Sequence, residues 1–521
     1  MKKFLGLSNN QKFDEAMKGI ENIGSNSFDE VKISKSIDEN SKYLKMIFEN
    51  CYDIVQKKFK IGSEQIDGFI VYVNGIVDKN FVTEKILNTL MTESRLTELE
   101  KKINKNKLIE FANKNITSIG DTKKVYTIQE ALDNILKANC VLFIDGNDNA
   151  LAFNIKTYES RDVSTPITES VIRGPMEGYT ENINTNTALL RNRVKTINLK
   201  TESFEIGSIS KTTVVICYIH GLIDIGILKE LRERIEKIEV DMINDSGEIE
   251  HYIEDSTFSP FPQVGVTERP DTCAAALAEG RATILVDGSP FALVVPNVFA
   301  HFLTAPEDKY NRFYFTSFIR LLRYISFFIS LFLPSLYVAL ITFHQEMIPS
   351  SLLITVASSY AGIPFPAVVE AFLLEFTFEI LREAGLRLPK PIGQAVNIVG
   401  ALIIGEAGVQ AGLSSRAMVV IVAFTGITSF AMPGYNAARI VRVFRFLLLV
   451  LGGTFGLFGI AIGALFILVH MASLRSFGVP YLSPLAPIHF KDWKDLFIKF
   501  PSKYIKDRPT FIQKYNLRKR N

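Results

Sequence analysis

The residues of this chain best suited to chemistry lie between Glu169 and Thr196, in the stretch ESVIRGPMEGYTENINTNTALLRNRVKT. Glutamates, asparagines and arginines surround a Gly-Pro turn there, as in many active sites. However, no histidine or cysteine lies nearby to form a nucleophile–base pair. The six histidines of the chain are isolated, and a P-loop and a GxGxxG motif are both absent. We therefore expect no enzyme, no metal site and no cofactor, and interpret the stretch as a binding or assembly surface.

A second group of chemical residues lies in an apolar context near the middle of the chain. Glu375, Glu379 and Glu383 are spaced i, i+4 and i+8, and no Lys or Arg occurs from His344 to Leu381. On a helix this spacing places the three carboxylates on one face. Carboxylates at membrane depth are costly and usually line water or pair with a cation. The alternative is an amphipathic interfacial helix whose glutamates face water or a partner.

The composition indicates a membrane protein with a separate water-soluble part. The chain has 521 residues and a positive mean hydropathy of +0.17, although 22% of its residues are charged. The apolar residues concentrate between Tyr324 and Val469. A net charge of +3 argues against nucleic acid as a partner. The four cysteines form no CxxC pair, which suits a reducing cytoplasm, and the N-terminus does not read as a signal peptide.

The soluble part contains an internal repeat. The segments GFIVYVNGIVDKNFVTEKIL (68–87) and TVVICYIHGLIDIGILKELRERI (213–235) both read as a strand, a glycine turn and a helix. Three positions match at one constant offset: Tyr72 with Tyr218, Gly75 with Gly221, and Asp78 with Asp224. The sequence therefore predicts two α/β subdomains of like plan. The alternative is two unrelated α/β units that share common strand–turn patterns.

A second repeated pair strengthens this prediction. CVLFIDGNDNALAFNI (140–155) and ATILVDGSPFALVVP (282–296) each read as a strand, an Asp-Gly turn and a strand. Each hairpin follows a helical segment, TIQEALDNILKAN and DTCAAALAEGR respectively. In the second helix we expect Asp271 to be the N-cap and Gly280 to end the helix.

The predicted fold is α+β with a membrane part: a cytosolic region of two similar α/β subdomains, followed by an all-α polytopic membrane domain. The predicted boundaries are an N-terminal tail (1–37), a first α/β subdomain (38–160), a second α/β subdomain (165–305), an amphipathic linker helix (306–323), a membrane domain (324–472) and a basic tail (473–521).

Four apolar runs in the membrane domain are clear candidates for spans: Tyr324–Phe343, Gly393–Leu413, Ala417–Met432 and Phe446–Val469. Arg320 and Arg323 precede the first, as the positive-inside rule expects for its cytoplasmic end. The small residues of the second and fourth suit close helix packing. Pro364–Leu381 is apolar but carries Glu370, Glu375 and Glu379, and is harder to assign.

The charged loops give conflicting topologies. The tail after residue 472 has eleven Lys/Arg and three acidic residues, which favours the cytoplasm. If both ends of the chain lie in the cytoplasm, the number of membrane crossings must be even. Four crossings satisfy this if 364–381 lies in the membrane interface or re-enters the membrane without crossing it. The arginines at 439, 442 and 445 then fall outside. If 364–381 crosses, these arginines move inside but the basic tail moves out. We prefer four crossings.

Several long segments resemble the A subunit of the GerA-type spore germinant receptors. In the soluble part they are VIRGPMEGYTENINTNTALLRNRVKT and PFPQVGVTERPDTCAAALAEGRATILVDGSPFALVVPNVF (260–299). In the membrane part they are TFHQEMIPSSLL, GIPFPAVVEAFLLEFTFEILREAGLRLPKPIGQAVNIVGALIIGEA and SLRSFGVPYLSPLAP. The resemblance is close over about 165–490 and looser before residue 160.

This resemblance implies a receptor in the inner membrane of a dormant bacterial spore. The N-terminus without a signal peptide and the basic tail place both terminal regions in the cytoplasm. It implies two partners, a transporter-like B subunit that holds the nutrient and a lipoprotein C subunit, besides membrane lipid. It also implies homo-oligomerisation into a nutrient-gated ion conduit. Two alternatives remain: a non-conducting scaffold that couples the partner subunit to downstream proteins, and a direct small-molecule sensor built on the paired α/β subdomains.

Two site predictions follow for such a subunit. Repeated around an oligomer, the acidic face would form rings that favour cations. The candidate ion path is Glu375, Glu379 and Glu383, with Glu406 and Gln410 as a second group. The polar stretch would shape an inter-subunit or interdomain surface through charge-assisted hydrogen bonds, and Arg191 and Arg193 are expected to be exposed on its helix. Its candidate residues are Arg173, Gly174, Glu177, Gly178, Glu181, Asn186, Arg191, Glu268 and Arg269. The alternative is that these bonds are internal to one subdomain.

Overall fold

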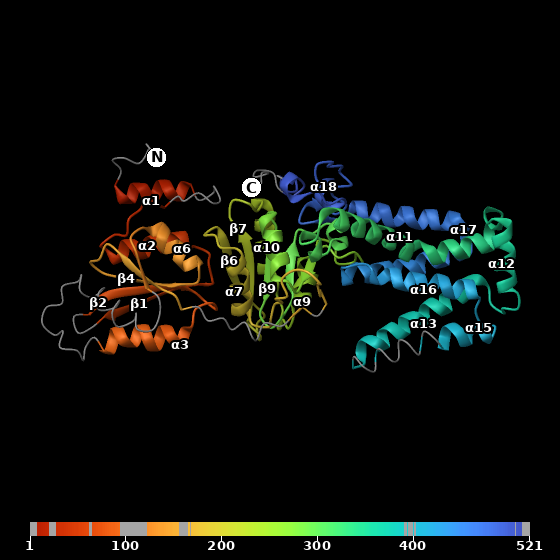
Figure 1. The fold of residues 1–521 in the computed structure, drawn as a ribbon, viewed down its shortest axis with the longest axis horizontal. Helices are drawn as coiled ribbons and strands as arrows, with labels where there is room; N and C mark the ends of the chain where they lie inside the picture. Colours follow the sequence, from red (N-terminus) through yellow and green to blue (C-terminus); the bar gives the residue numbers. More distant parts are fainter. Residues whose placement is uncertain are drawn as a thin grey trace. The chain divides into compact units, whose positions relative to one another are not determined.

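The structure is a computed structural model, and it describes residues 8–19, 28–61, 65–93, 122–155, 165–166, 168–389, 393, 400, 403–505 and 507–512. The chain forms two compact units (Figure 1). The α/β unit comprises Met1–Glu254, Val264–Pro296 and Asp507–Arg520. The helical unit comprises Asp255–Gln263 and Asn297–Lys506. Each unit is described by itself below.

The first subdomain is an antiparallel five-stranded sheet in the order β1-β2-β4-β5-β3. Its strands are β1 (Ile54–Ile61), β2 (Ile66–Val73), β3 (Thr122–Val125), β4 (Cys140–Ile144) and β5 (Ala150–Phe153). Helices α2 (Ile37–Ile47) and α6 (Ile128–Leu136) pack against one face, and α1 (Asn9–Lys18) packs on the outer side of α2, where Phe13 stacks on Tyr43 (Figure 1). Helix α3 (Lys79–Phe81), continued by π-helical turns over Val82–Leu87 and Thr89–Glu93, packs against the other face.

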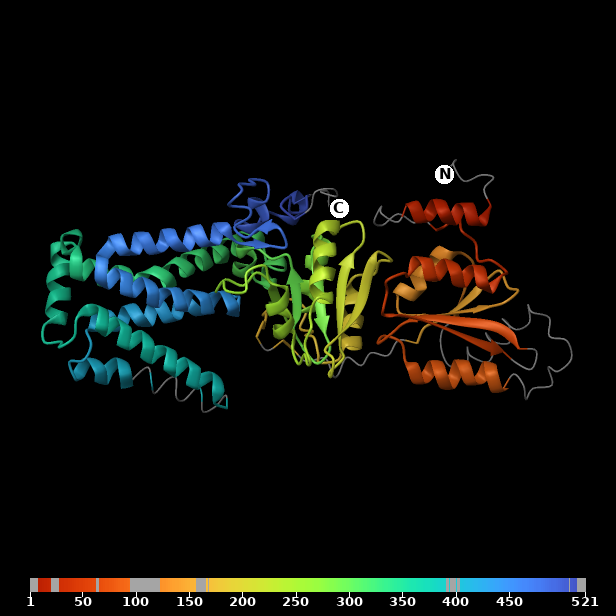
Figure 2. The same cartoon turned by 180° about the vertical axis from the view of Figure 1, so that it is seen from behind.

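The alternation of side chains along β2 explains this three-layer packing. Phe69 and Val71 point into the core shared with α2 and α6, whereas Ile70 and Tyr72 point into the core shared with the α3 segment. Because successive strand side chains face opposite sides, a strand covered on both faces is apolar throughout. Figure 2 shows helices on both sides of this sheet.

The second subdomain repeats the first, as the sequence predicts. Its sheet order is β6-β7-β9-β10-β8, which matches the first sheet strand for strand. The strands are β6 (Leu199–Ile206), β7 (Thr212–Ile219), β8 (Gly265–Thr267), β9 (Ala282–Val286) and β10 (Ala292–Val295). Helices α7 (Ile183–Arg193) and α10 (Pro270–Ala278) cover one face. On the other face, Tyr218 contacts Arg232 of α8 (Ile225–Glu236), which is followed by α9 (Ser246–Ile253).

The matched turn residues have matched conformations. Gly75 and Gly221 both have φ of 81°, a value that favours glycine. Asp78 and Asp224 are the N-caps of the helices that follow. The prediction for α10 is half right: Gly280 follows its end with φ of 88°, but the N-cap is Arg269. Asp271 lies in the first turn instead, because Pro270 occupies the first helical position, which proline favours.

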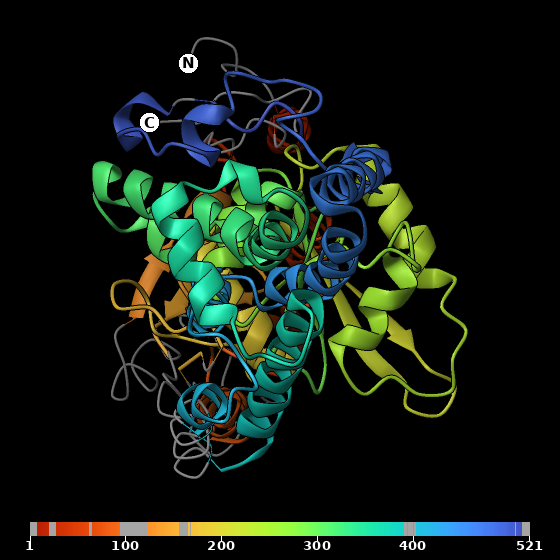
Figure 3. The same ribbon diagram turned by 90° about the vertical axis from the view of Figure 1, so that its right-hand side faces the viewer.

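The helical unit is built from α11 (Phe313–Phe343), α12 (Ser350–Tyr360), α13 (Ala367–Arg387), α15 (Gly408–Gln410), α16 (Arg416–Phe430) and α17 (Tyr435–Ser473), with short 3₁₀ turns at Phe299–Leu303, Pro306–Lys309, Gln345–Met347 and Ser502–Tyr504. A π-helical turn, Ile403–Ala407, precedes α15. The tail adds the small β11–β12 hairpin (Arg475–Ser476, Val479–Pro480) and α18 (Trp493–Leu496). Helix α12 runs across the end of α11 (Figures 1 and 3).

Two predicted boundaries differ in the structure. The linker is not a separate helix, because α11 runs without interruption from Phe313 through Pro334 to Phe343. The predicted span Phe446–Val469 is not one straight helix either. Gly456 has non-helical dihedrals (φ 63°, ψ −146°), and the chain reverses there. A Cβ on Gly463 would lie 2.6 Å from Leu448, so the two arms of α17 pack antiparallel.

By length and composition, two described helices can cross a membrane, Phe313–Phe343 and Ala438–Ser473, and Arg416–Phe430 is a shorter apolar helix. The second of these contains the reversal at Gly456. The predicted span Gly393–Leu413 falls partly outside the described residues, at 394–399 and 401–402. Pro364–Leu381 corresponds to α13, a continuous helix of 21 residues, long enough at about 1.5 Å per residue to span the apolar core of a membrane.

Candidate functional site

Arg191 is the residue of the predicted surface that joins the two subdomains. It lies on α7 of the second subdomain and is completely buried, so the predicted exposure of Arg191 is wrong. Its guanidinium donates from Nε and Nη2 to the two carboxylate oxygens of Asp53, at 2.6 and 2.7 Å, and Asp53 directly precedes β1 of the first subdomain. Nη1 donates to the carbonyls of Thr196 and Leu199. Thr201 donates its hydroxyl to Asp53 at 2.7 Å.

Further polar contacts cross the same boundary, beside the apolar packing of Ala188 and Ile197 against the core of the first subdomain. Lys200 Nζ donates to the carbonyls of Ile47 and Glu49, each at 2.9 Å. Asn74 Nδ2 donates to Asn184 Oδ1 at 2.8 Å. The neighbouring turn residue, Gly75, could not carry a side chain, because a Cβ would lie 2.5 Å from the Asn184 carbonyl oxygen. The repeated glycine therefore serves the subdomain boundary as well as the turn.

Burial and charge act against each other at this boundary. Burial alone would raise the pKa of Asp53, but the Arg191 guanidinium and its hydrogen bonds hold this pKa below the usual 3.8. Burial lowers the pKa of Lys200, and burial raises the pKa of the nearby Cys51 thiol. The Asp53–Arg191 pair is therefore fully ionised at neutral pH.

Most of the other predicted surface residues make contacts inside the second subdomain. Arg193 pairs with Glu177 at 2.5 Å, and its side chain is 23% exposed. Asn186 accepts from the Thr180 backbone amide at 2.8 Å and is buried. These two bonds fold the polar stretch back onto α7, as the internal alternative describes.

Glu268 and Arg269 hold the start of the same stretch. Glu268 accepts from the hydroxyl and the backbone amide of Thr168, at 2.8 and 3.3 Å. The buried Arg269 donates to the carbonyls of Glu169 and Pro175 and pairs with Asp271 at 3.1 Å. Both residues therefore act within the second subdomain.

The remaining four predicted residues contribute little side-chain chemistry. Arg173 is exposed, and Gly178 is buried. Gly174 has φ of 138° and supports the bend after Arg173. Glu181 is exposed and contributes its backbone carbonyl, which accepts from the Gly288 amide at 2.8 Å. Of the nine residues, then, Arg191 is the one whose described contacts reach the other subdomain.

The predicted ion-path residues of α13 face arginines in the helical unit. Glu375 pairs with Arg445 of α17, and both side chains are only 1% exposed. Glu379 pairs with Arg442 at 3.0 Å and lies 3.6 Å from Arg382. The sequence pointed to the carboxylates but not to these partners, because α17 lies more than fifty residues later. The signal that could have found them is the spacing of the arginines at 439, 442 and 445 on one helical face.

The Glu375–Arg445 pair is incompletely satisfied. Among the described residues, the second oxygen of Glu375 and the Nε and Nη2 atoms of Arg445 have no hydrogen-bond partner, although all three atoms are buried. Glu370, one turn earlier and 1% exposed, accepts from the Ser415 hydroxyl at 2.8 Å, and its other oxygen is also unmatched. Buried polar atoms without partners are costly, so this face of α13 favours water, an ion or a change of conformation.

The other predicted ion-path residues are paired locally. Glu383 pairs with Arg387 at 2.7 Å on the exposed end of α13. Glu406 accepts from Gln410 at 3.2 Å, and both are exposed. Among the residues that the structure describes, no group of three His, Cys, Asp or Glu side chains could hold a metal ion.

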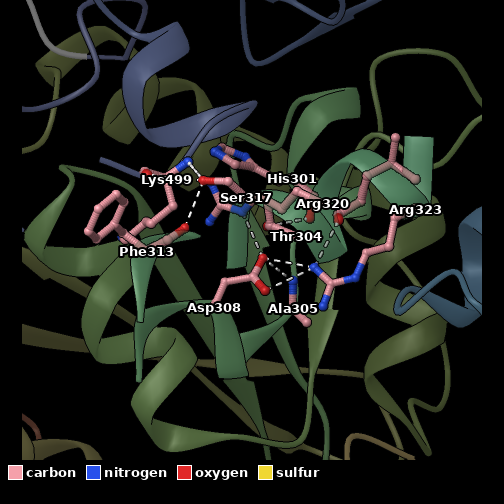
Figure 4. A network of polar contacts seen from close by, with 10 residues as sticks. His301, Thr304, Ala305, Asp308, Phe313, Ser317, Arg320, Arg323 and Lys499 are labelled. Carbon is pink, nitrogen blue, oxygen red and sulfur yellow. Dashed lines mark hydrogen bonds and ion pairs between the residues drawn. The ribbon is translucent and has the colours of Figure 1, made fainter. Parts of the chain in front are cut away.

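A third charged cluster lies at the start of α11 (Figure 4). Asp308 accepts from Arg320 Nε at 2.9 Å and from Arg323 Nη1 at 2.8 Å, and all three side chains are nearly buried. Ser317, on the same turn of helix, accepts from the Lys499 backbone amide at 3.1 Å. Arg320 and Arg323, which the sequence places at the cytoplasmic end of the first span, are therefore tied to the turn before the helix.

Comparison with known proteins gives consistent matches. Residues 42–511 match the family "Bacillus/Clostridium GerA spore germination protein". The chain is 43% identical to the uncharacterized membrane protein YfkQ of Bacillus subtilis (strain 168), over 97% of this chain and 96% of that protein. It is 41% identical to spore germination protein KA of the same organism, over 93% and 88%. A crystal structure of the N-terminal domain of the A subunit of the Bacillus megaterium spore germinant receptor GerK3 is 33% identical, with a TM-score of 0.41 over 51% of this chain and 97% of that chain.

Proposed function

We propose, for a chain that belongs to the GerA family of spore germination proteins and is the A subunit of a germinant receptor, that its helical unit forms a nutrient-gated ion conduit. The family consists of receptors and not enzymes, and membership implies a complex with B and C subunits. In this proposal several copies assemble in the inner membrane of the spore. The transporter-like B subunit holds the nutrient, and the lipoprotein C subunit completes the receptor.

The observation that carries the proposal is the buried, incompletely paired charge on α13. Ionisable side chains inside membrane helices are costly and usually mark ion pathways or relays. Glu375 and Arg445 are each 1% exposed and leave three hydrogen-bonding atoms unmatched. In the conduit reading this conformation is closed, because the arginines of α17 neutralise the carboxylates. Opening separates α13 from α17, so that Glu375 and Glu379 line water.

The reversal at Gly456 supports a topology that resolves the conflict in the charged loops. If α13 crosses the membrane, the arginines at 439, 442 and 445 lie inside. If each arm of α17 then crosses, the basic tail also returns to the cytoplasm. Together with α11, 393–413 and α16, this makes six crossings in place of the four preferred from the sequence. All the basic segments then obey the positive-inside rule.

The scaffold alternative has one observation in its favour: Glu379 and Glu383 are both paired with arginines and need no ion. A scaffold would couple the B subunit to downstream germination proteins without conducting. The pairing of the acidic face then serves only to hold α13 against α17.

Conductance of the purified receptor in liposomes, with and without nutrient, distinguishes the two. The conduit predicts a cation-selective current that Glu375→Gln/Glu379→Gln changes in selectivity. The matched control is Arg387→Gln, which alters an exposed pair on the same helix. A folded, complete receptor that carries no current in the presence of a nutrient that triggers germination would support the scaffold alternative.

A further inference from the structure

We propose that the tail segment 485–504 and the start of α11 form one surface that lies on the cytoplasmic leaflet of the membrane and binds the headgroups of anionic phospholipids. Both parts belong to the helical unit, within Asn297–Lys506. The inference goes beyond the conduit and does not rest on it, because lipid contact can be measured without any current. It rests on α11 crossing the membrane with its first residues on the cytoplasmic side.

Helix α11 is longer than the apolar core of a membrane requires. Its 31 residues extend over about 46 Å at about 1.5 Å per residue, whereas the apolar core is about 30 Å thick. The uncharged part of the helix is 324–343, which is long enough to cross that core. Residues 313–323 therefore extend past the core, to the level of the lipid headgroups.

This first part of α11 presents an uncovered apolar stripe. Tyr314, Phe318, Leu321 and Ile325 are spaced i, i+4, i+7 and i+11, which places them on one face of the helix, and all four are exposed. The arginines of the same turns are buried against Asp308 (Figure 4). Aromatic side chains at the end of a membrane helix are typical of the interface between lipid and water. The stripe therefore suits contact with lipid.

The tail runs along the same turns of α11. The Lys499 backbone amide donates to the Ser317 hydroxyl at 3.1 Å (Figure 4). Two turns further along the helix, Phe497 packs on Tyr324, with the ring centroids 5.2 Å apart. Because Tyr324 is the first residue of the uncharged part of α11, these contacts place the tail at the level where the apolar core begins.

The tail segment intersperses lysines with exposed apolar side chains. Lys491, Lys494 and Lys503 are exposed. The segment 485–504 has four lysines and two aspartates, which gives it a net charge of +2. Its exposed large apolar side chains are Leu485, Ile488, Phe490, Ile498, Phe500 and Tyr504. Basic and large apolar side chains in one segment are typical of polypeptides that lie in the membrane interface.

Charge and position together identify the occupant of this surface. A lysine near an anionic membrane contributes about 1 kcal/mol to binding, whereas a zwitterionic headgroup offers no net charge to attract it. The apolar stripe continues directly into the part of α11 that crosses the membrane, so the surface is continuous with the lipid around the span. We therefore assign the surface to anionic lipid of the cytoplasmic leaflet and not to a protein partner.

Trp493 can report on this surface, because it is the only tryptophan of the chain and lies within the tail segment. Its ring packs between those of Phe490 and Phe497, with centroids 5.3 and 5.5 Å away. Bromine atoms on the acyl chains of nearby lipids quench tryptophan fluorescence. The quenching therefore shows which lipid lies beside the tail.

The test measures this quenching in the full-length protein, in nanodiscs of phosphatidylcholine with 30% phosphatidylglycerol. Bromines are placed either on the phosphatidylglycerol or on the phosphatidylcholine. We expect brominated phosphatidylglycerol to quench Trp493 at least about twofold more per lipid molecule, because the lysines concentrate it there. The variant Lys491→Gln/Lys494→Gln/Lys503→Gln should lose this preference while Trp493 remains accessible to both lipids.

Two further variants separate charge from apolar contact. Lys42→Gln/Lys45→Gln/Lys57→Gln removes three exposed lysines of the α/β unit, so it changes the net charge equally and should keep the preference. Ile488→Ser/Ile498→Ser removes two exposed apolar side chains of the tail and should lower quenching by both lipids alike. Raising the salt concentration from about 0.05 M to about 0.5 M should weaken the preference of the wild type, because salt screens exposed charges.

Three results would overturn the proposal. The first is equal quenching of wild-type Trp493 by the two brominated lipids at low salt. The second is an unchanged preference in the tail lysine variant when its melting temperature is normal. The third is the absence of quenching by either lipid, which would show that the tail does not reach the bilayer and would leave its exposed surface to a protein partner.

Discussion

The two units of this protein each bury an arginine–carboxylate pair, but they satisfy it differently. In the α/β unit, Arg191 and Asp53 share two hydrogen bonds, and Thr201 and two carbonyls complete the shell. In the helical unit, Glu375 and Arg445 leave three buried atoms without partners among the described residues. A fully bonded buried pair stabilises one arrangement, whereas a partly bonded one lowers the cost of leaving it. The first pair suits a fixed joint and the second a switch.

The largest expected effect comes from breaking the fixed joint. Asp53→Asn leaves the Arg191 charge buried without a counter-charge, and we expect a loss of about 3–5 kcal/mol in unfolding free energy. Urea-dependent pulse proteolysis of the α/β unit in the full-length protein measures it. Asp53→Leu with Arg191→Met should recover much of the loss, because neither charge is then stranded. A loss below about 1 kcal/mol in the single variant would mean that the pair is solvated.

Breaking the partly bonded pair should change gating more than folding. Arg445→Gln removes a charge-assisted hydrogen bond worth about 1.5–3 kcal/mol, which corresponds to a shift of about ten- to hundredfold in the closed–open equilibrium. Liposomes with this variant should leak cations without nutrient. Arg387→Gln, on the exposed Glu383 pair, serves as the control and should remain tight. A nutrient-dependent, otherwise normal current in Arg445→Gln would show that the pair is not the switch.

A smaller effect is expected two residues from Arg191. Arg193 lies on the same helix, but its pair with Glu177 is partly exposed, at 23% and 54% for the two side chains. Solvent screens such pairs, so Arg193→Met should cost less than about 1 kcal/mol in the same proteolysis measurement. If Arg193→Met cost as much free energy of unfolding as Asp53→Asn, the location of the arginine on α7, and not the burial of its ion pair, would decide the effect.

These contrasts also show what the sequence could reveal. The duplicated strand–turn–helix pattern predicted both sheets, because a matched Gly75/Gly221 and a matched Asp78/Asp224 are local signals for a turn and a helix cap. The burial of Arg191 could not be predicted in this way, since Asp53 lies 138 residues earlier in the chain. A polar helix face is predicted to be exposed to solvent when the segment that packs against it is not known.

The helical unit illustrates the same limit. Hydropathy reports how apolar a segment is but not where it turns, so the two arms of α17 read as one span. Glycines are common in membrane helices, and the positive φ of Gly456 becomes apparent only in three dimensions. The acidic face of α13 was visible as a spacing pattern. Its neutralisation by Arg442 and Arg445 was not, because those partners belong to another helix.

The smallest expected effect compares the buried Asp53 carboxyl with the partly buried Glu169 carboxyl of the α/β unit. Burial raises the pKa of Glu169 above 4.5, although hydrogen bonds from Thr267 and the Glu268 amide oppose the shift, whereas the pKa of Asp53 lies below 3.8. With a raised pKa the folded state binds more protons than the unfolded state, so the Glu169 contribution favours unfolding as pH rises through its folded pKa. The Asp53 contribution has the opposite sign: it is complete above pH 4 and is lost as pH falls through the lowered pKa.

Pulse proteolysis at a series of pH values from 4.5 upward tests the Glu169 contribution, because this contribution is lost as pH rises through the raised pKa of Glu169. Asp53 stays ionised over this series, because its pKa lies below 3.8. The wild-type α/β unit should gain stability as the pH falls, and Glu169→Gln should flatten that slope while Asp53→Asn leaves it unchanged. An unchanged slope in Glu169→Gln would mean that Arg269, 100 residues away in sequence but bonded to the Glu169 carbonyl, stabilises the carboxylate enough to offset burial. An arginine would then keep the carboxylate charged at both Asp53 and Glu169.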